Sequence, residues 1–268
     1  MLYAKGAKVT IVARTEAKLK KAAETISKEG KGQVQYFCFD LSNPDVNKVE
    51  ELFTQAEDKF GNVEYLFCNA GSSLPTMFLE ADLDYYESQM KTNYLNYVKT
   101  SQTMAKRMAQ RRSGTIVYVS SILGALTCVG YSAYSPSKHA IKALADVVRI
   151  ELAPYNVNVH LFLPGSILTP GYYEENKMKP EVSKRVEGTA DFLEPDKCAH
   201  ILLNGMERGN YLITTEMLFE LTNPASIGSC DRSNVLLNLA LAPLSVLTNY
   251  FINYVNHSEM AKEKLKKE

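Results

Sequence analysis

Two side chains that can exchange a proton lie four residues apart near the middle of the chain, Tyr134 and Lys138. Apolar residues recur at helical spacing over residues 137–153, and Pro136 suits a first helical turn. We therefore predict a helix that presents both side chains on one face. An ammonium beside a phenol favours the phenolate, so Lys138 would lower the tyrosine pKa from about 10 and make Tyr134 a general acid or base. Tyr131 has a serine four residues later and is not a candidate.

A tyrosine and a lysine at this spacing also occur by chance at the start of helices, so other residues must agree. Ser121 ends residues 115–121, which are predicted to be a buried strand leaving into a loop. Its hydroxyl could bind the carbonyl oxygen that the tyrosine protonates. Small and polar residues hold similar places beside other predicted elements: Asn69, Ala70 and Gly71 after a strand at 63–68, Asn93 between helices at 83–90 and 94–112, and Pro164, Gly165, Ile167 and Thr169 after a strand at 158–163.

The composition argues against several classes of protein. A chain of 268 residues, 46% hydrophobic and 22% charged, is typical of one large globular domain. The 30 basic and 30 acidic side chains balance, which gives no support to nucleic-acid binding. The five cysteines contain no C-x-x-C pair, so we predict neither a disulfide framework nor a metal site.

Strands and helices are expected to alternate from the first residues onward. We predict a strand at 8–14, a helix at 15–29 capped by Thr15, a strand at 33–39 and a helix from 43 to about 61. This alternation predicts an α/β fold, a doubly wound parallel sheet with helices on both faces. We assign residues 1–215 to this domain and residues 216–268 to a C-terminal apolar segment with a basic tail.

In order and spacing these motifs resemble those of the short-chain dehydrogenase/reductase family, over roughly residues 2–210. The resemblance implies a Rossmann-type fold and hydride transfer between a nicotinamide cofactor and a ketone. Tyr134 would donate the proton and Ser121 would bind the same oxygen, while Lys138 would hold the nicotinamide ribose. By the same resemblance, other residues bind the cofactor or position water: Asn93 keeps a water next to Lys138, Asp40 and Leu41 contact adenine, Ile167 and Thr169 position the carboxamide, and Asn69, Ala70, Gly71, Pro164 and Gly165 line the cofactor site.

The family's glycine-rich turn is not found, because neither G-x-x-x-G-x-G nor G-x-G-x-x-G occurs in the sequence. In a dinucleotide-binding fold that turn follows the first strand and cradles the pyrophosphate. The strand at 8–14 matches the family's second strand, so we expect the first strand, the turn and most of the first helix to precede Met1. The alternative is a protein that has lost normal cofactor binding and acts as a catalytically silent, membrane-associated interaction protein.

Charge indicates which nicotinamide cofactor is used. Members that use NAD usually carry an acidic residue after the second strand. Here Arg14 holds that place and Lys18 follows one turn later, which suits the 2′-phosphate of NADP. A solvated cationic helix start is the alternative, although positive charge there opposes the helix dipole.

The last third differs from a generic reductase. Residues 170–180 hold the place of the family's substrate lid, and residues 234–255 form a largely apolar stretch interrupted by Pro243 and several asparagines. Such a stretch is a poor uninterrupted transmembrane helix. It could lie on or re-enter a membrane surface, which we favour, or form the interface of a homo-oligomer. Lys264 and Lys266 have the spacing of an endoplasmic-reticulum retrieval signal or belong to a solvated basic tail.

Within the family, residues 170–180 and the apolar segment resemble the members that reduce long-chain keto-sphingoid bases. That resemblance implies NADPH as the cofactor and a location on the endoplasmic-reticulum membrane, with the catalytic domain on the cytosolic face. Another NADP-linked reductase of the family, acting on a steroid, retinoid or fatty-acyl ketone, is the alternative.

Overall fold

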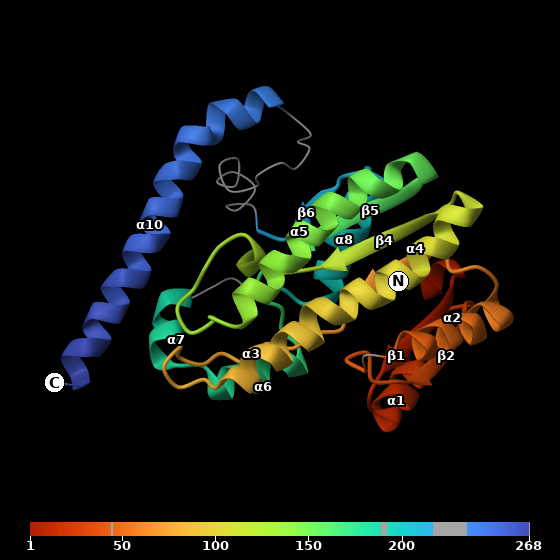
Figure 1. Ribbon diagram of the computed structural model, residues 1–268, viewed down its shortest axis with the longest axis horizontal. Coiled ribbons are helices and arrows are strands. Elements are labelled where there is room, and N and C mark those ends of the chain that lie inside the picture. Colours follow the sequence, from red (N-terminus) through yellow and green to blue (C-terminus); the bar gives the residue numbers. More distant parts are fainter. Residues whose placement is uncertain (44, 189–191, 217–234, 268) are drawn as a thin grey trace.

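The computed structural model describes residues 1–43, 45–188, 192–216 and 235–267, and Figure 1 shows their arrangement. Parallel strands alternate with helices along most of the chain, as predicted. The elements are β1 (Lys8–Ala13), α1 (Glu16–Ser27), β2 (Gln33–Cys38), α2 (Val46–Phe60), β3 (Tyr65–Cys68), α3 (Leu83–Gln89), α4 (Asn96–Arg111), β4 (Gly114–Val119), α5 (Tyr134–Leu152), β5 (Val157–Leu163), α6 (Pro170–Met178), α7 (Glu181–Glu187), α8 (Pro195–Glu207), β6 (Leu212–Thr214) and α10 (Val235–Lys267).

The strands form two separate sheets. One contains β1 and β2, and the other has the order β3-β4-β5-β6, with all neighbours parallel. β1 pairs with β2 along one edge, and β3 pairs with β4 along one edge. Among the described residues, no strand pairs with the opposite edge of either strand. The break lies where the family's first strand was expected, and the prediction of an α/β fold with parallel strands is confirmed.

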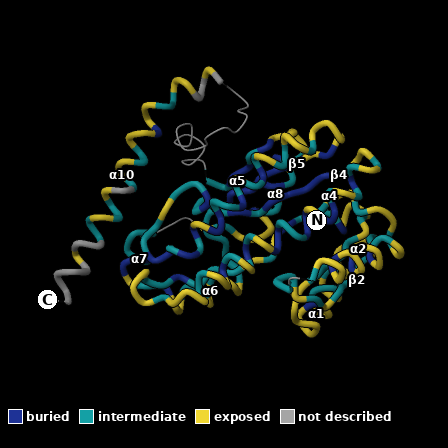
Figure 2. Tube along the Cα trace, in the orientation of Figure 1, coloured by how far each residue is buried: buried dark blue, intermediate teal, exposed yellow. Residues whose placement is uncertain are grey.

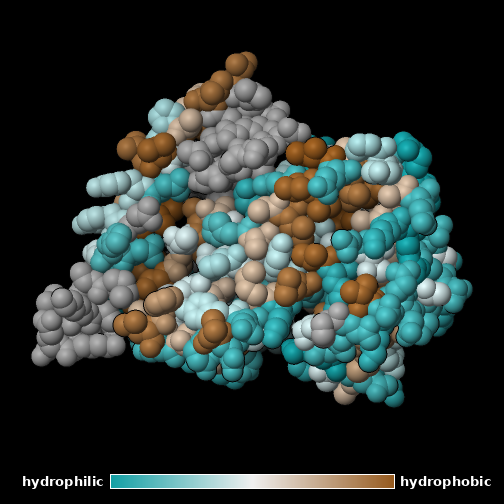
Figure 3. Space-filling view, viewed as in Figure 1, coloured by the Kyte–Doolittle hydropathy of each residue, from teal (hydrophilic) through white to brown (hydrophobic). Residues whose placement is uncertain are grey.

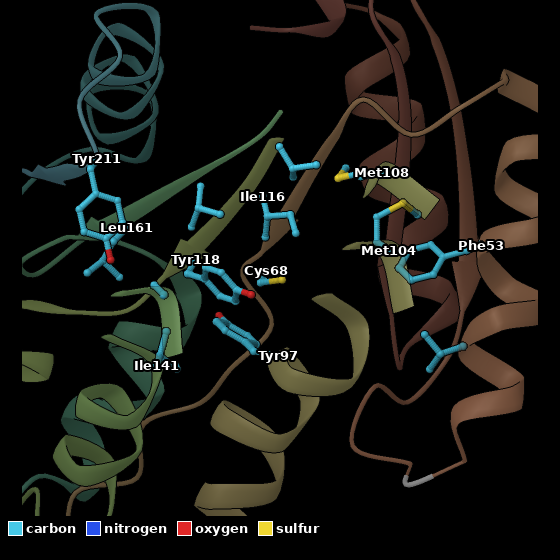
Figure 4. Close-up of a cluster of buried hydrophobic side chains, with 14 of the residues drawn as sticks. Phe53, Cys68, Tyr97, Met104, Met108, Ile116, Tyr118, Ile141, Leu161 and Tyr211 are labelled. Carbon is cyan, nitrogen blue, oxygen red and sulfur yellow. The ribbon is translucent and has the colours of Figure 1, made fainter. Parts of the chain in front are cut away.

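Alternating side chains of the larger sheet build a core on each face. Ile116 and Leu161 pack with residues of α4 and α5, including Met104 and Ile141, as Figure 4 shows. The intervening residues Val117 and Phe162 pack on the other face against Cys198 and Leu202 of α8. Side chains alternate between the faces of a strand, so this apolar pattern requires helices on both faces. Figure 2 shows the buried β4 between helices that are exposed on their outer sides.

Polar contacts hold the β1–β2 sheet and its helices against α4. The guanidinium of Arg107 on α4 donates to Glu57 at 2.5 Å and also to Glu50, both on α2. Lys99 of α4 donates from Nζ to the backbone oxygen of Leu41 at 2.9 Å and to that of Asn43. The segment after β2 is therefore fastened to the helix that packs on β3 and β4.

Two local expectations need correction. The stretch around Asn93 was expected to separate two helices, but a π-helical turn, Met90–Leu95, joins α3 directly to α4. Such turns often occur at functional sites because they aim one side chain out of the regular helical pattern. Thr15 does occupy the N-cap position of α1, yet its side chain makes no capping hydrogen bond.

The C-terminal helix α10 runs for 33 residues with Pro243 inside it. It packs against α7 through an ion pair between Arg185 and Glu259 at 2.8 Å, and Val129 donates its backbone N–H to Asn256 at 3.0 Å. None of the helices in the described ranges is both long and apolar enough to cross a membrane. Asn234, at the start of the predicted apolar segment, lies outside the described residues.

Large apolar side chains are exposed along this helix. Figure 3 shows apolar surface on the part of the molecule where α10 lies. The exposed residues are Leu236, Leu239, Leu244, Val246, Leu247, Tyr250, Phe251 and Tyr254.

Candidate active site

The predicted central pair comes together at the start of α5. Tyr134 is the first residue of that helix, and Lys138 lies one turn later with 5% of its surface exposed. The Lys138 ammonium donates to the backbone oxygen of Val119 at 3.1 Å and lies 5.6 Å from the centre of the Tyr134 ring. Tyr97 of α4 donates to the same oxygen at 3.1 Å. The end of β4 thus fixes the lysine against the tyrosine.

The protonation of this pair differs from the sequence prediction. Burial raises the pKa of Tyr134, the negative charge of Glu175 raises it further, and the Ser121 hydroxyl opposes both. Burial also lowers the pKa of Lys138 to about 8. The expected lowering of the Tyr134 pKa by Lys138 is therefore wrong for this structure, because loss of water outweighs every other influence on the phenol. The phenol keeps its proton at neutral pH, which is the state that a proton donor needs.

Ser121 follows β4 and faces the tyrosine across a tight turn. Its Oγ accepts a hydrogen bond from the backbone of Leu123 at 3.2 Å and lies close enough to Tyr134 to lower the pKa of the phenol. The preceding Ser120 donates to the backbone oxygen of Lys138 at 2.8 Å. A Cβ at Gly124 would lie 2.7 Å from that same oxygen, so only glycine lets the turn approach α5 this closely.

Asn93 is fully buried and links the loop after β3 to α5. Its Nδ2 donates to the backbone oxygen of Ser72 and to Ser137 Oγ, both at 3.0 Å, and its Oδ1 accepts from the Ser72 N–H at 2.9 Å. A Cβ at Gly71 would lie 3.0 Å from Asn93 Oδ1 and 3.7 Å from Lys138 Nζ. Glycine at this position keeps open the space beside the lysine.

The remaining residues predicted near the nicotinamide also lie at the carboxyl ends of these strands. Asn69 and Ala70 follow β3, and the backbone oxygen of Ala70 accepts a hydrogen bond from Asn96. After β5, Pro164 accepts from the backbone of Ile122 at 3.0 Å, and Gly165 donates to Thr215 at 2.8 Å. Ile167 pairs with Leu193, and Thr169 caps α6 by accepting from Tyr172 at 3.1 Å.

The predicted adenine-side residues lie apart from this group, at the carboxyl ends of β1 and β2. Arg14 and Lys18 are exposed. Hydrogen bonds from Ser42 lower the pKa of Asp40, with smaller contributions from the charges of Arg14 and Lys99. Leu41 follows Asp40 and accepts from Lys99, as described above. Because β1 and β3 do not pair, the two groups of candidate residues stand on separate sheets.

Four neighbouring residues were missed by the sequence analysis. Tyr131, set aside as a candidate, directs its hydroxyl to Glu175 and Glu187 at 2.7 Å each. Lys179 donates to Glu187 at 2.6 Å and is almost completely buried. The spacing of Glu175 and Lys179, four apart in the predicted lid, was the one available signal. No local pattern points to Tyr131 or Glu187.

Fold and site together define a Rossmann-type α/β protein in which tyrosine, lysine, serine and asparagine converge at the strand ends. The chain belongs to the short chain dehydrogenase family, whose model matches residues 1–180. The resemblance inferred from the motifs is thereby confirmed.

Curated relatives point to one branch of that family. The chain is 37% identical to the 3-dehydrosphinganine reductase of Danio rerio, over 78% of this chain and 64% of that protein. It is 35% identical to the 3-ketodihydrosphingosine reductase of Mus musculus, over 92% of this chain and 71% of that protein. The chain thus spans about two thirds of the length of these relatives.

Solved structures share the fold at lower sequence identity. A short-chain dehydrogenase from Sphingobium yanoikuyae in complex with NADPH matches with a TM-score of 0.71 at 20% identity, over 87% of this chain and 90% of that one. Levodione reductase matches with a TM-score of 0.72 at 21% identity, over 80% of this chain and 88% of that one.

Proposed function

We propose that this protein reduces the ketone of 3-ketodihydrosphingosine with NADPH. The observation that carries the proposal is the placement of Tyr134 beside Ser121 and Lys138, in a chain that matches named reductases of this ketone over 78% to 94% of its length. The phenol donates its proton to the alkoxide that forms from the ketone. The serine hydroxyl hydrogen-bonds the same oxygen, so negative charge meets two donors as it develops.

Lys138 provides the test of whether a nicotinamide cofactor fits. An ammonium carries three donors. Within the described residues Lys138 makes one hydrogen bond, to Val119, although it is buried. Two donors remain for the hydroxyls of a ribose, and Gly71 leaves room for it. When bound, a reduced nicotinamide would supply the hydride. Arg14 and Lys18 suit the 2′-phosphate that distinguishes NADPH from NADH.

The direct experiment follows loss of NADPH fluorescence when the purified chain is mixed with 3-ketodihydrosphingosine in neutral detergent micelles, and identifies the amino alcohol product by mass spectrometry. Steroid, retinoid and fatty-acyl ketones are run in parallel. Faster reduction of one of these would reassign the substrate. Failure to bind NADPH even after a strand and a glycine-rich turn are added before Met1 would favour a catalytically silent interaction protein, the alternative raised by the missing turn.

We also propose that the protein lies on the surface of the endoplasmic-reticulum membrane, with the catalytic domain on the cytosolic face. Support comes from the apolar residues exposed along α10, which suit the boundary between headgroups and acyl chains. A homo-oligomer that covers the same face is the competing arrangement.

A charge placed on this face distinguishes the two arrangements. Leu247→Glu should reduce sedimentation with phosphatidylcholine vesicles about tenfold, since burying a leucine contributes about 1.5–3 kcal/mol. Ile150→Glu, at a comparably exposed apolar position on α5, is the matched control. Unchanged vesicle binding, together with a smaller particle in gel filtration, would instead identify an oligomer interface.

A further inference from the structure

A partly buried group of charged and polar side chains connects the predicted lid to the loop before Tyr134. Tyr131, at the end of the loop before α5, places its hydroxyl 2.7 Å from an oxygen of Glu175 on α6 and 2.7 Å from an oxygen of Glu187 on α7. The ammonium of Lys179, between these helices, lies 2.6 Å from Glu187 and 3.4 Å from Glu175. Two carboxylates therefore approach one hydroxyl and one ammonium.

The charges of this group do not balance. The side chains of Glu175, Glu187 and Lys179 are 18%, 23% and 1% exposed, so water screens them poorly. The Tyr131 hydroxyl carries a single hydrogen, which can satisfy only one carboxylate at a time. Burial raises the pKa of this phenol, and the two carboxylates raise it further, so it stays neutral. Two negative charges face one positive charge, and charges removed from water are normally paired.

The excess negative charge faces the catalytic tyrosine. The rings of Tyr131 and Tyr134 lie 6.0 Å apart, and Glu175 is near enough for its charge to act on the Tyr134 phenol. Both contacts of Glu175 use its Oε1. In the described part of the chain, Oε2 of this residue accepts no hydrogen bond. One carboxylate oxygen of Glu175 therefore remains for a ligand.

We propose that Glu175, supported by Glu187, binds the ammonium group of the substrate. This inference rests on the proposed function, because 3-ketodihydrosphingosine carries its amine on the carbon next to the ketone. With the ketone oxygen at Tyr134 and Ser121, the amine nitrogen lies two bonds from the reacting carbon. A carboxylate that accepts from an ammonium makes a charge-assisted hydrogen bond, about twice as strong as a neutral one.

A substrate cation would also restore the balance of charge in the site. Glu175 disfavours the negative charge that appears on Tyr134 as the phenol gives up its proton. An ammonium between the two groups offsets this repulsion when substrate is bound. A ketone without the amine would leave the repulsion in place. Glu175 is thus a specificity-determining residue, whereas Lys179 and Tyr131 position it.

The test compares binding of two unreactive lipids by isothermal titration in neutral detergent micelles at neutral pH. One is dihydrosphingosine, the amino alcohol product, and the other is the matching diol that lacks the amine. Wild-type protein should bind the amine about tenfold or more tightly, as expected for one charge-assisted hydrogen bond. Glu175→Gln should abolish this preference. Glu174→Gln should keep it, because Glu174 is exposed and, within the described ranges, forms its ion pair with the exposed Lys177.

The outcomes separate this inference from the proposed function. Equal binding of both lipids by the wild-type protein would overturn the inference. A preference for the amine that is kept by Glu175→Gln would also overturn it, and neither result can come from misfolding of the variant. Turnover of the ketone is measured in the same preparations. An amine preference without turnover would support the ammonium site and reject the reductase. In an active enzyme, Glu175→Gln should raise KM for the amino ketone and leave KM for its amine-free counterpart nearly unchanged.

Discussion

At the scale of single residues, the proton on Tyr134 is subject to opposing influences. Burial and the charge of Glu175 hold the proton on the phenol, while the hydroxyl of Ser121 favours its release. Lys138 contributes less than its spacing suggests, because its ammonium is aimed at the oxygen of Val119. The raised pKa favours the protonated phenol that the proposed role of Tyr134 as proton donor requires.

Removing the phenol hydroxyl tests this role directly. In the protein extended by the upstream strand and glycine-rich turn, Tyr134→Phe should abolish ketone reduction and leave NADPH binding largely intact, since only the donated proton is lost. NADPH oxidation and a fluorescence titration measure the two properties. Tyr155→Phe, at an exposed position, is the matched control and should be neutral. Turnover above about a tenth of the wild-type rate in Tyr134→Phe would remove Tyr134 from the mechanism, since that loss is less than about 1.4 kcal/mol.

Lys138 predicts an unusual dependence of stability on pH. Its pKa is about 8 when folded, against 10.5 as the ordinary value. Between these values the unfolded chain holds a proton that the folded chain does not, so rising pH stabilises the fold through this residue. Relative to Lys138→Met, the free energy of unfolding of the cofactor-free protein should increase by about 3 kcal/mol across this window.

Urea unfolding of both proteins at the two ends of the window measures the effect. Buried cysteines and tyrosines with raised pKa act in the opposite direction at high pH, but they are common to both proteins and cancel in the difference. A difference that does not change with pH would mean that Lys138 keeps its charge inside the folded protein.

At the scale of elements, parts defined by local pattern were predicted well. Short apolar runs predicted β4 and β5 as buried strands, and helical spacing predicted α5, because both patterns depend on residues close together in the sequence. The π-helical turn around Asn93 has no comparable local signature. The partners of Tyr131 lie 44 and 56 residues further along the chain, so only the folded structure could identify them.

The end of β1 predicts cofactor preference. Arg14→Ala should reduce the preference for NADPH over NADH about tenfold or more, because a charge-assisted contact to phosphate contributes about 1.5–3 kcal/mol. Lys18→Ala should have a smaller effect. The ratio of kcat/KM for the two cofactors measures the preference, with Lys20→Ala, another exposed cation of α1, as control. An unchanged ratio in Arg14→Ala would show that this side chain faces solvent and does not contact the cofactor.

At the scale of the whole molecule, the break between the two sheets is the feature that most limits cofactor binding. Arg14 and Asp40 stand on one sheet, while Lys138 and Asn93 stand beside the other, and a dinucleotide must reach both. The sequence supplies no glycine-rich turn to bind the pyrophosphate between them. One apolar core, which includes Phe53 of α2 and Met104 and Met108 of α4, connects the two parts, together with the polar contacts of α4.

The facing edges of β1 and β3 are expected to be costly, though less so than the sequence alone suggests. A fully buried strand edge would leave N–H and C=O groups without hydrogen-bond partners, at a cost of about 1–3 kcal/mol each. The summed cost would exceed the roughly 5–15 kcal/mol stability of a domain. Most residues of β1 are only partly buried, so water can satisfy part of this edge. An open edge of this kind favours association between chains.

A strand supplied to this break should therefore improve both folding and cofactor binding. We expect the 268-residue chain to aggregate and to bind NADPH weakly, and a version with a strand and a G-x-x-x-G-x-G turn added before Met1 to be monodisperse and to bind NADPH tightly. The control carries the same added segment with two prolines in its strand, which remove the ladder donors. Light scattering and NADPH fluorescence titration compare the three. If the 268-residue chain is monodisperse and binds NADPH as tightly as the extended one, another part of the molecule performs the role of the missing strand and turn.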